Sequence, residues 1–341
     1  MHILRRLALA VSFLLFLGHQ HSARAAAPLD PDPIDSVDTP RVINIVDDFL
    51  NFWDQTRGMS LRRQHRAFIR MVENKHRDYF DRAVYRSADE DERRIMLDQF
   101  LLRVPWQIAK IREFNKVAPG LVDQTLFDFR SRFSEYQQEQ DIYIGPSLFR
   151  FDGSVRAVQN DTGIPDTLCL SAEVLSGYSP EQIQIVIAHE LFHLYHFSFL
   201  RREATASQFH KAHMSLMVEG MAVAGAEAVY PYLDPSVYLN FSDGQLFQQE
   251  SELMFNGRRF LRLMADGAPP EEYEPWFTNS FDVRIPPRGG YLLGYEVTRR
   301  VLATFTLEQM VRFSPAWLRE HAEQQLSAIA NEEVFLFAGG N

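Results

Sequence analysis

The chain has 341 residues, of which 46% are hydrophobic, and a formal net charge of −10 at pH 7. That length and apolar content are enough to build a substantial core in one or two domains, and they exclude an intrinsically disordered chain. The acidic balance, without any block rich in Lys or Arg, argues against nucleic acid and anionic membranes as partners.

The first residues have the pattern of a secretory signal peptide. Arg5 and Arg6 precede an apolar run from Leu7 to Leu17, and residues 23–25, Ala-Arg-Ala, provide a small-x-small cleavage site. This run is too short for a comfortable transmembrane span, and no later stretch is long and apolar enough for one. We predict cleavage after residue 25, an exported chain that is periplasmic or secreted, and no integral membrane segment in the mature protein. An uncleaved N-terminal anchor is the alternative.

The mature chain is more acidic, because residues 1–25 contain three arginines and no acidic residue, so that their removal takes the formal charge from −10 to −13. Its single cysteine, Cys169, cannot form an internal disulfide, and stability must come from packing. Residues 26–41 are rich in Pro and Asp, and we expect a flexible lead-in. Residues 42–137 carry apolar side chains at three-to-four spacing among charges, which predicts a helical region.

Residues 138–341 are predicted to form the functional core with a C-terminal helical part. The core begins with short strand patterns: residues 141–145, a hairpin over residues 148–158 around the turn pair Asp152-Gly153, and residues 167–171. We therefore expect an α+β fold that is mostly helical, with a small mixed β-sheet ahead of the next helix.

That next helix is predicted over residues 179–199 and contains the sequence His189-Glu-Leu-Phe-His193. Ser179, Pro180 and Gln182 have the arrangement of a capping box with proline at the first helical position. Two histidines four residues apart on a helix point toward one metal ion, with the glutamate beside its bound water. The motif also arises by chance, but an apolar helix makes a buried His/Glu cluster costly unless it has a partner such as a metal. This context favours His189 and His193 as ligands.

A catalytic zinc ion needs a third protein ligand. Glu219 is the best candidate, because it lies in an otherwise apolar helix predicted over residues 215–229, whose small residues would allow close packing. His196, His210 and His213 are its rivals. His196 lies two turns beyond His189 on the same helix face, so we expect a supporting or substrate-side role for it, or a polar surface role. His210 and His213 fit a polar connection between the two helices better.

These motifs together resemble a known family. The sequence His189-Glu-Leu-Phe-His193, followed by Glu219-Gly-Met-Ala222 and by the stretch RGGYLLGY at residues 288–295, resembles the gluzincin metallopeptidases. It is most similar to a family of predicted zinc-dependent proteases with HExxH and EGxA motifs. The resemblance covers about residues 142–315 and implies a zincin-like fold, one Zn²⁺ per chain bound by His189, His193 and Glu219, and Glu190 as the general base. One departure is Val223, where the thermolysin-like pattern has an acid that orients a histidine.

The resemblance also implies a reaction. A peptide bond would be hydrolysed by attack of a zinc-bound water that Glu190 deprotonates. Tyr291 and Tyr295 are candidate donors to the negative charge of the tetrahedral intermediate, with aromatic packing as the alternative for each. We expect the strand at residues 167–171 to pair with an extended peptide or protein substrate.

Other functions stay open at this stage. A zinc hydrolase of a non-peptide bond would be favoured by a deep blind pocket. A zincin-shaped binding or assembly protein without turnover is a second alternative, against which the intact Glu190 argues. A structural or carrier zinc site is disfavoured, because such sites usually use four Cys or His ligands. The sequence does not determine the oligomeric state.

Overall fold

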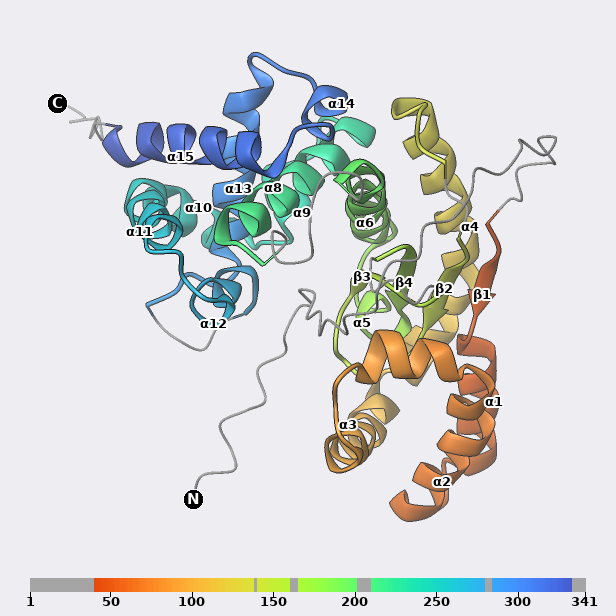
Figure 1. The fold of residues 1–341 in the computed structure, drawn as a ribbon. Coiled ribbons are helices and arrows are strands. Elements are labelled where there is room, and N and C mark those ends of the chain that lie inside the picture. The colour runs from red at the N-terminus through yellow and green to blue at the C-terminus, as the bar shows by residue number, and fades with distance from the viewer. Residues whose placement is uncertain (1–39, 138–139, 160–164, 201–209, 280–283, 333–341) are drawn as a thin grey trace, which may run out of the picture.

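The computed structural model describes residues 40–137, 140–159, 165–200, 210–279 and 284–332 (Figure 1). These residues form a mostly helical structure with one four-stranded mixed sheet ahead of the helix that carries His189 and His193, which confirms the predicted α+β class. The predicted signal peptide and most of the Pro/Asp-rich segment lie outside the described residues and stay predictions. Among the described helices, none combines the length and apolar composition needed to cross a bilayer.

The region predicted to be helical over residues 42–137 is helical from Val46 to Arg132, but it opens on a strand, Val42–Asn44, which pairs with residues 142–144 of the sheet. Its core is aromatic: the rings of Phe49, Phe52, Phe68, Phe80 and Phe100 pack with centroid distances of 5.4 to 6.5 Å. Tilted and edge-to-face contacts of this kind add to the free energy gained by burial. The elements are α1 (Val46–Thr56), α2 (Leu61–Met71), η1 (Glu73–Lys75), η2 (Tyr79–Tyr85), α3 (Glu90–Arg103), η3 (Val104–Trp106) and α4 (Ile108–Arg132).

The sheet has the strand order β1-β2-β4-β3. Strands β1 (Val42–Asn44), β2 (Ile142–Gly145) and β4 (Thr167–Ser171) are parallel, and β3 (Gly153–Arg156) pairs antiparallel with β4. Because β4 has a neighbouring strand on each side, the expectation that it pairs with a substrate is wrong. Strands β1 and β3 are the two outer strands of the described sheet; all four residues of β3 are buried, whereas those of β1 are partly buried.

The predicted hairpin over residues 148–158 is wrong in its first arm. Leu148 and Phe149 have φ values of 56° and 61°, which a strand cannot contain. The buried Glu173 carboxylate accepts hydrogen bonds from the backbone amides of Ser147 at 3.0 Å and Phe149 at 2.7 Å, and it thereby stabilises an irregular segment. A side chain distant in sequence therefore satisfies the backbone groups that a hairpin partner would have paired.

Helix α6 lies between the sheet and the C-terminal helices (Figure 1). It contacts β3 and β4 on one side and packs against α4 and α8 on others. The remaining elements are α5 (Ala172–Leu175), α6 (Pro180–Leu200), α8 (Ala212–Val229), α9 (Pro235–Leu239), α10 (Asp243–Ser251), α11 (Leu253–Ala265), α12 (Pro270–Tyr273), η4 (Glu274–Phe277), α13 (Gly289–Leu302), α14 (Leu307–Met310) and α15 (Pro315–Asn331).

Glycines at helix crossings bring α6, α8 and α13 together. A methyl group on Gly220 of α8 would collide with the backbone of Gly294 in α13. A methyl group on Gly225 would collide with the ring of Phe192 in α6. These contacts confirm the predicted close packing of the small-residue helix, and they place Glu219, next to Gly220, where the three helices meet.

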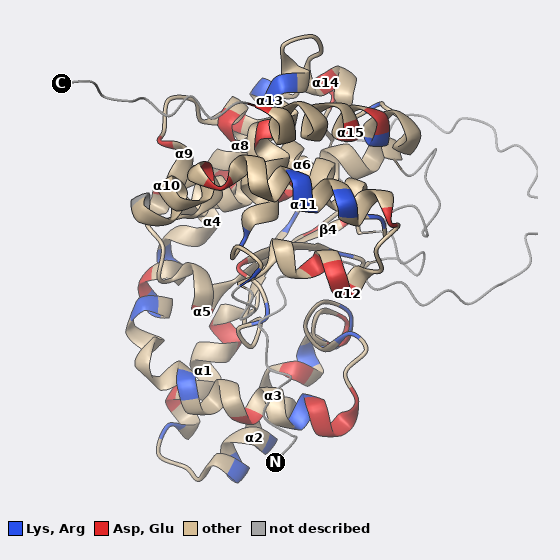
Figure 2. Ribbon diagram, turned by 90° about the vertical axis from the view of Figure 1, so that its left-hand side faces the viewer, with Lys and Arg blue, Asp and Glu red and all other residues tan. Residues whose placement is uncertain are grey.

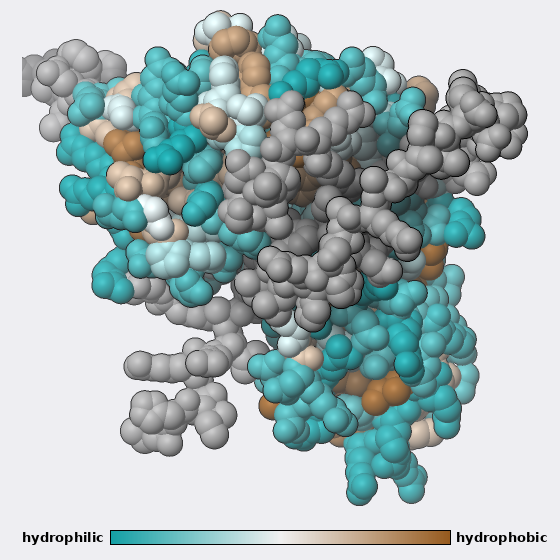
Figure 3. All heavy atoms as spheres, in the orientation of Figure 1, coloured by the Kyte–Doolittle hydropathy of each residue, from teal (hydrophilic) through white to brown (hydrophobic). Residues whose placement is uncertain are grey.

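Charged residues of both signs lie on the described helices (Figure 2), and one face of the described molecule is mainly polar (Figure 3). Acidic and basic residues are interspersed over the helices in Figure 2. The described part of the face in Figure 3 is largely hydrophilic, with small apolar areas.

Candidate metal centre and adjoining pocket

Helix α6 begins at the capping box that the sequence predicts. The Ser179 hydroxyl accepts a hydrogen bond from the Gln182 amide at 3.2 Å, and the Gln182 side-chain oxygen accepts one from the Ser179 amide at 2.9 Å. These bonds satisfy two backbone donors that the first turn would otherwise leave free. The helix then runs unbroken through Leu200, so His189 and His193 lie one turn apart on the same face.

His189, His193 and Glu219 form one compact group, in which one ligand atom from each residue lies within 4.8 Å of the others. Nε2 of His189 is 3.1 Å from Oε2 of Glu219, and Nε2 of His193 is 3.5 Å from the same oxygen. Ligand atoms bonded at about 2.0–2.2 Å to a tetrahedral zinc ion are roughly 3.4 Å apart. The spacing and the donor set therefore fit a single divalent ion, so these three residues could hold a metal.

Burial and mutual attraction set the protonation of this group. Burial alone would raise the pKa of Glu219, but the adjacent imidazoles of His193 and His189 hold it well below its usual range. Burial lowers the pKa of His189. It opposes the charge of His193 as well, yet the Glu219 carboxylate raises the pKa of His193 overall. Glu219 is thus ionised and ready to act as a ligand.

Glu190 faces the space beside the group. Its side chain lines a pocket together with His189, and burial raises the pKa of Glu190 to about 7, against the opposing effect of His193. A carboxylate that titrates near neutrality is suited to accept a proton and to return it. Gly153 of β3 leaves room for this side chain, since a Cβ atom there would lie 2.9 Å from Cγ of Glu190.

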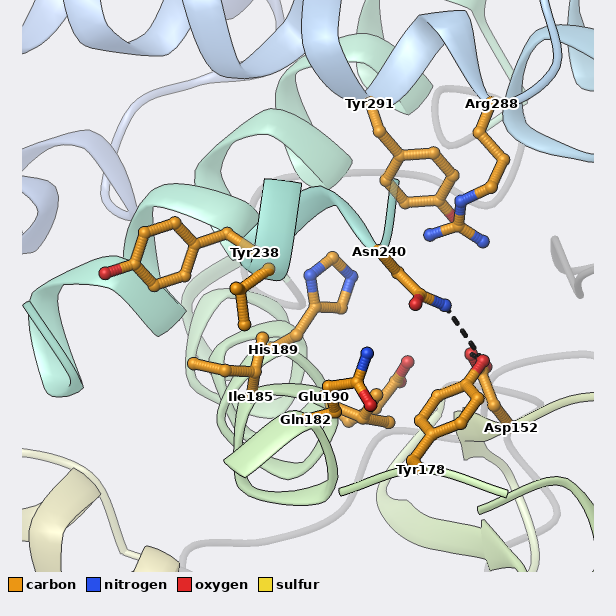
Figure 4. A pocket seen from close by; sticks show the side chains of 12 residues that line it. Asp152, Tyr178, Gln182, Ile185, His189, Glu190, Tyr238, Asn240, Arg288 and Tyr291 are labelled. Carbon is orange, nitrogen blue, oxygen red and sulfur yellow. Dashed lines mark hydrogen bonds between the residues drawn. The ribbon is translucent and has the colours of Figure 1, made fainter. Parts of the chain in front are cut away.

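The pocket lies between α6 and the start of α13 (Figure 4). Figure 4 shows Arg288 and Tyr291 reaching in from the α13 side, with His189 and Glu190 on the opposite wall. Asn240 donates a hydrogen bond to the Tyr178 hydroxyl at 2.8 Å, and this hydroxyl donates to Asp152 at 3.4 Å. The lining residues are Asp152, Tyr178, Gln182, Ile185, Val186, His189, Glu190, Val237, Tyr238, Asn240, Arg288 and Tyr291.

The two candidate tyrosines lie in different surroundings. The ring of Tyr291 lines the pocket, and its centroid is 6.1 Å from that of His189. Tyr295, one turn further along α13, donates a hydrogen bond to the Glu227 carboxylate at 2.8 Å and does not line this pocket. The structure therefore brings Tyr291, but not Tyr295, to the candidate metal centre.

The other histidines considered as ligands are outside the group. His196 is fully buried, neither of its ring nitrogens has a hydrogen-bond partner, and it does not line the pocket. His210 and His213 are also outside the metal-binding group of the described residues. Glu219 is thus the residue that joins the two histidines of the HExxH sequence.

The acid that the thermolysin-like pattern has at position 223 is a valine in this chain, and the structure shows how one histidine of the group is held without it. Val223 is fully buried, and Nδ1 of His193 is buried without a hydrogen-bond partner. A metal-binding histidine usually donates its second N–H group to a carboxylate or a carbonyl. Here the ring of His193 stacks with Phe197 at a centroid distance of 5.7 Å, so packing holds it in place of that hydrogen bond.

Sequence reasoning missed the polar side of the pocket. The Asp152-Gly153 pair predicts a turn, and the motif at residues 288–295 points to its tyrosines, so neither Asp152 nor Arg288 is predicted as a site residue. Arg288 and Asn240 both have positive φ values, 57° and 53°. The pair of glycines directly after Arg288 was the available sign that the chain makes a close approach there.

Comparison with protein-family models, with curated proteins and with solved structures finds no match for this chain. The assignment therefore depends on the geometry of the described residues. The group of His189, His193 and Glu219 fits an HExxH…E zincin-like arrangement. Such a site suggests a metal-dependent hydrolase.

Proposed function

We propose that the chain is a zinc-dependent peptidase that is exported to the periplasm or secreted. The observation that carries the proposal is the placement of Glu190 beside the His189, His193 and Glu219 group at the wall of a pocket. Two histidines and a glutamate favour zinc among the divalent metals. The resemblance of the HExxH and EGxA motifs to predicted zinc-dependent proteases supports a peptide substrate, and the N-terminal sequence pattern supports export.

The roles of the residues follow from where they lie. A zinc ion bound by the three ligands supplies Lewis-acid activation of water and of the scissile carbonyl. Glu190 accepts the proton of the attacking water and delivers it to the leaving amine. Burial, reinforced by Glu219, raises the pKa of Tyr291 well above its usual value, so its hydroxyl stays protonated and can donate to the developing oxyanion.

Metal content and peptide hydrolysis, measured together on three variants, test the proposal. We expect Glu190→Gln to keep one zinc per chain and to lose at least about 100-fold in kcat. Glu219→Ala should lose most of the zinc and the activity with it. Glu181→Gln changes an exposed glutamate on the same helix and should alter neither property. Full activity in Glu190→Gln, or zinc fully retained in Glu219→Ala, would show that the site is assigned wrongly.

A zinc hydrolase of a non-peptide bond is the second candidate function. It is favoured by the small size of the pocket and by the burial of β3, the outer strand that contacts α6, which closes that edge of the sheet to an extended peptide. Amide and ester substrates without a peptide backbone, offered to the same variants, separate the two. Zinc binding without turnover of either class would indicate a zincin-shaped binding protein.

A further inference from the structure

Arg288 lines the pocket without an acidic partner. Its guanidinium carbon lies 4.3 Å above the ring of Tyr291, a cation-π contact, and its Nε atom is buried with no hydrogen-bond partner. Among the ion pairs of the described residues, none involves Arg288. Because Nε is closed off from solvent, a ligand in the pocket would meet the terminal nitrogens of the guanidinium, which Figure 4 shows at the pocket wall.

The backbone around Arg288 holds the residue at the edge of the pocket. Its φ of 57° is left-handed, a conformation that favours glycine over a branched or long side chain. Its amide donates to the carbonyl of Thr278 at 2.9 Å, which fixes this conformation. Asn240, which lines the same pocket, also has a left-handed φ of 53°, a conformation that asparagine adopts with little strain.

Among the described residues that line the pocket, Arg288 is the one Lys or Arg, and two others are acids. Of these, Asp152 already accepts hydrogen bonds from the Tyr178 hydroxyl at 3.4 Å and from the Gly153 amide at 2.8 Å. Glu190 has the role of the base. The cavity has a volume of about 40 Å³, enough for a group of a few atoms. The guanidinium is therefore the group left to receive a small anionic part of a substrate.

We propose that Arg288 binds a substrate carboxylate beside the scissile bond, so that the enzyme prefers substrates that end in, or carry, a free carboxylate there. A guanidinium presents a planar pair of donors that matches the two oxygens of a carboxylate. The carboxylate comes from the C-terminus of a peptide or from an Asp or Glu side chain. The cleavage of the adjacent bond rests on the proposed peptidase function, whereas binding of the carboxylate does not.

Binding to the zinc-loaded full chain carrying Glu190→Gln tests this proposal without turnover. Calorimetric titration compares N-acetyl-trialanine as the free acid with the same peptide as the C-terminal amide. We expect the acid to bind at least tenfold more tightly. Adding Arg288→Gln should reduce that ratio to about one, and Arg288→Lys should retain part of it as a point charge. Arg284→Gln, at an exposed position of the same loop that does not line this pocket, should keep the full ratio.

A second peptide pair separates the two sources of the carboxylate. C-terminally amidated peptides with Glu or with Gln at the central position show whether a side-chain carboxylate is also accepted, and an Arg288-dependent preference for Glu supports the same subsite. Zinc content and thermal unfolding show that the Arg288 variants are folded.

Three results would overturn the inference: equal affinity for acid and amide with no preference for Glu over Gln, an acid preference that survives Arg288→Gln, or no binding of any peptide. If the preference holds but the chain without substitution cleaves no peptide, the peptidase assignment fails and the carboxylate subsite stands.

Discussion

His196 shows what burial does to a titratable side chain that has no partner. Burial, with a smaller contribution from His193, lowers its pKa from 6.5 to about 3, so the folded chain keeps this imidazole neutral. Between about pH 3 and pH 6.5, the His196 imidazole is therefore protonated in the unfolded chain but neutral in the folded chain. Stability contributed by the neutral ring is therefore present above about pH 6.5 and is lost as the pH falls toward 3, by at most about 1.4 kcal/mol per pH unit.

Replacing His196 by leucine should remove this dependence. We predict that His196→Leu loses less stability than the parent chain between about pH 6.5 and pH 4.5, because leucine has no proton to gain on unfolding. Urea unfolding at a series of pH values, with both proteins in the same metal state, measures the difference. Parallel curves for the two proteins would mean that His196 is not held neutral by burial.

Substitution of Tyr291 and of Tyr295, both in α13, compares a tyrosine that lines the pocket with one that does not. If the proposed function is correct, Tyr291→Phe should lower kcat about 100-fold while the zinc content stays the same, because an oxyanion donor is lost from the pocket. Tyr295→Phe removes the bond to Glu227 and should lower the melting temperature with little change in kcat. Steady-state kinetics and thermal unfolding of both variants decide between them. A large fall in kcat for Tyr295→Phe, without one for Tyr291→Phe, would place the oxyanion donor at Tyr295.

At the scale of elements, the crossing of α8 and α13 depends on the absence of side chains at Gly220 and Gly294. We predict that Gly220→Ala destabilises the fold by about 1–3 kcal/mol, because the methyl group collides with the backbone of α13 and must push the helices apart. Zinc affinity should fall as well, since Glu219 is the adjacent residue. Thermal unfolding and a zinc competition titration measure the two effects.

Gly120 provides the control for that substitution. It lies inside α4, and a methyl group on it would meet nothing within 4 Å. Gly120→Ala should therefore stabilise the chain by roughly 0.5–1 kcal/mol through helix propensity alone. Similar stability changes for the two glycine variants would contradict a packing role for Gly220.

Local signals in the sequence were enough to predict the helices of the site. These signals are the capping box at Ser179 and the small residues after Ser215, and both depend on residues only a few positions apart. Helices α6 and α8 therefore begin and end close to their predicted bounds. The first arm of the hairpin was mispredicted because its backbone is held by Glu173, 26 residues after Ser147. No local pattern reports a hydrogen bond of that kind.

At the scale of the whole molecule, the candidate metal centre joins helices that belong to different layers. His189 and His193 come from α6, which packs on the sheet, and Glu219 comes from α8, which packs on α13 and α15. An ion bound at this junction should stabilise the entire fold by mass action, by about 2.7 kcal/mol when its free concentration is 100 times the dissociation constant.

We therefore predict that a chelator lowers the melting temperature and that added zinc restores it. Glu219→Ala should melt at the same temperature with and without the chelator, since it lacks the third ligand. Differential scanning calorimetry on both proteins makes the measurement. If the chelator leaves the melting temperature of the parent chain unchanged, no stabilising ion occupies the junction.

The pocket itself is the part that the sequence could not reveal. The three candidate metal ligands, His189, His193 and Glu219, are predicted from two motifs on neighbouring helices. The pocket instead combines side chains from α6, α9 and α13 with Asp152, which directly precedes β3, and only the long-range packing of these elements brings Asp152, Asn240 and Arg288 to one pocket.

The metal-binding group and the pocket should form at different times during folding. His189 and Glu219 are only 30 residues apart in sequence, so the loop that must close to join them is short and its entropic cost is small. Asp152 and Arg288 are separated by more than four times that distance, and their meeting must wait for slower, non-local contacts. During folding, the chain should be able to capture a metal ion before it can recognise a substrate.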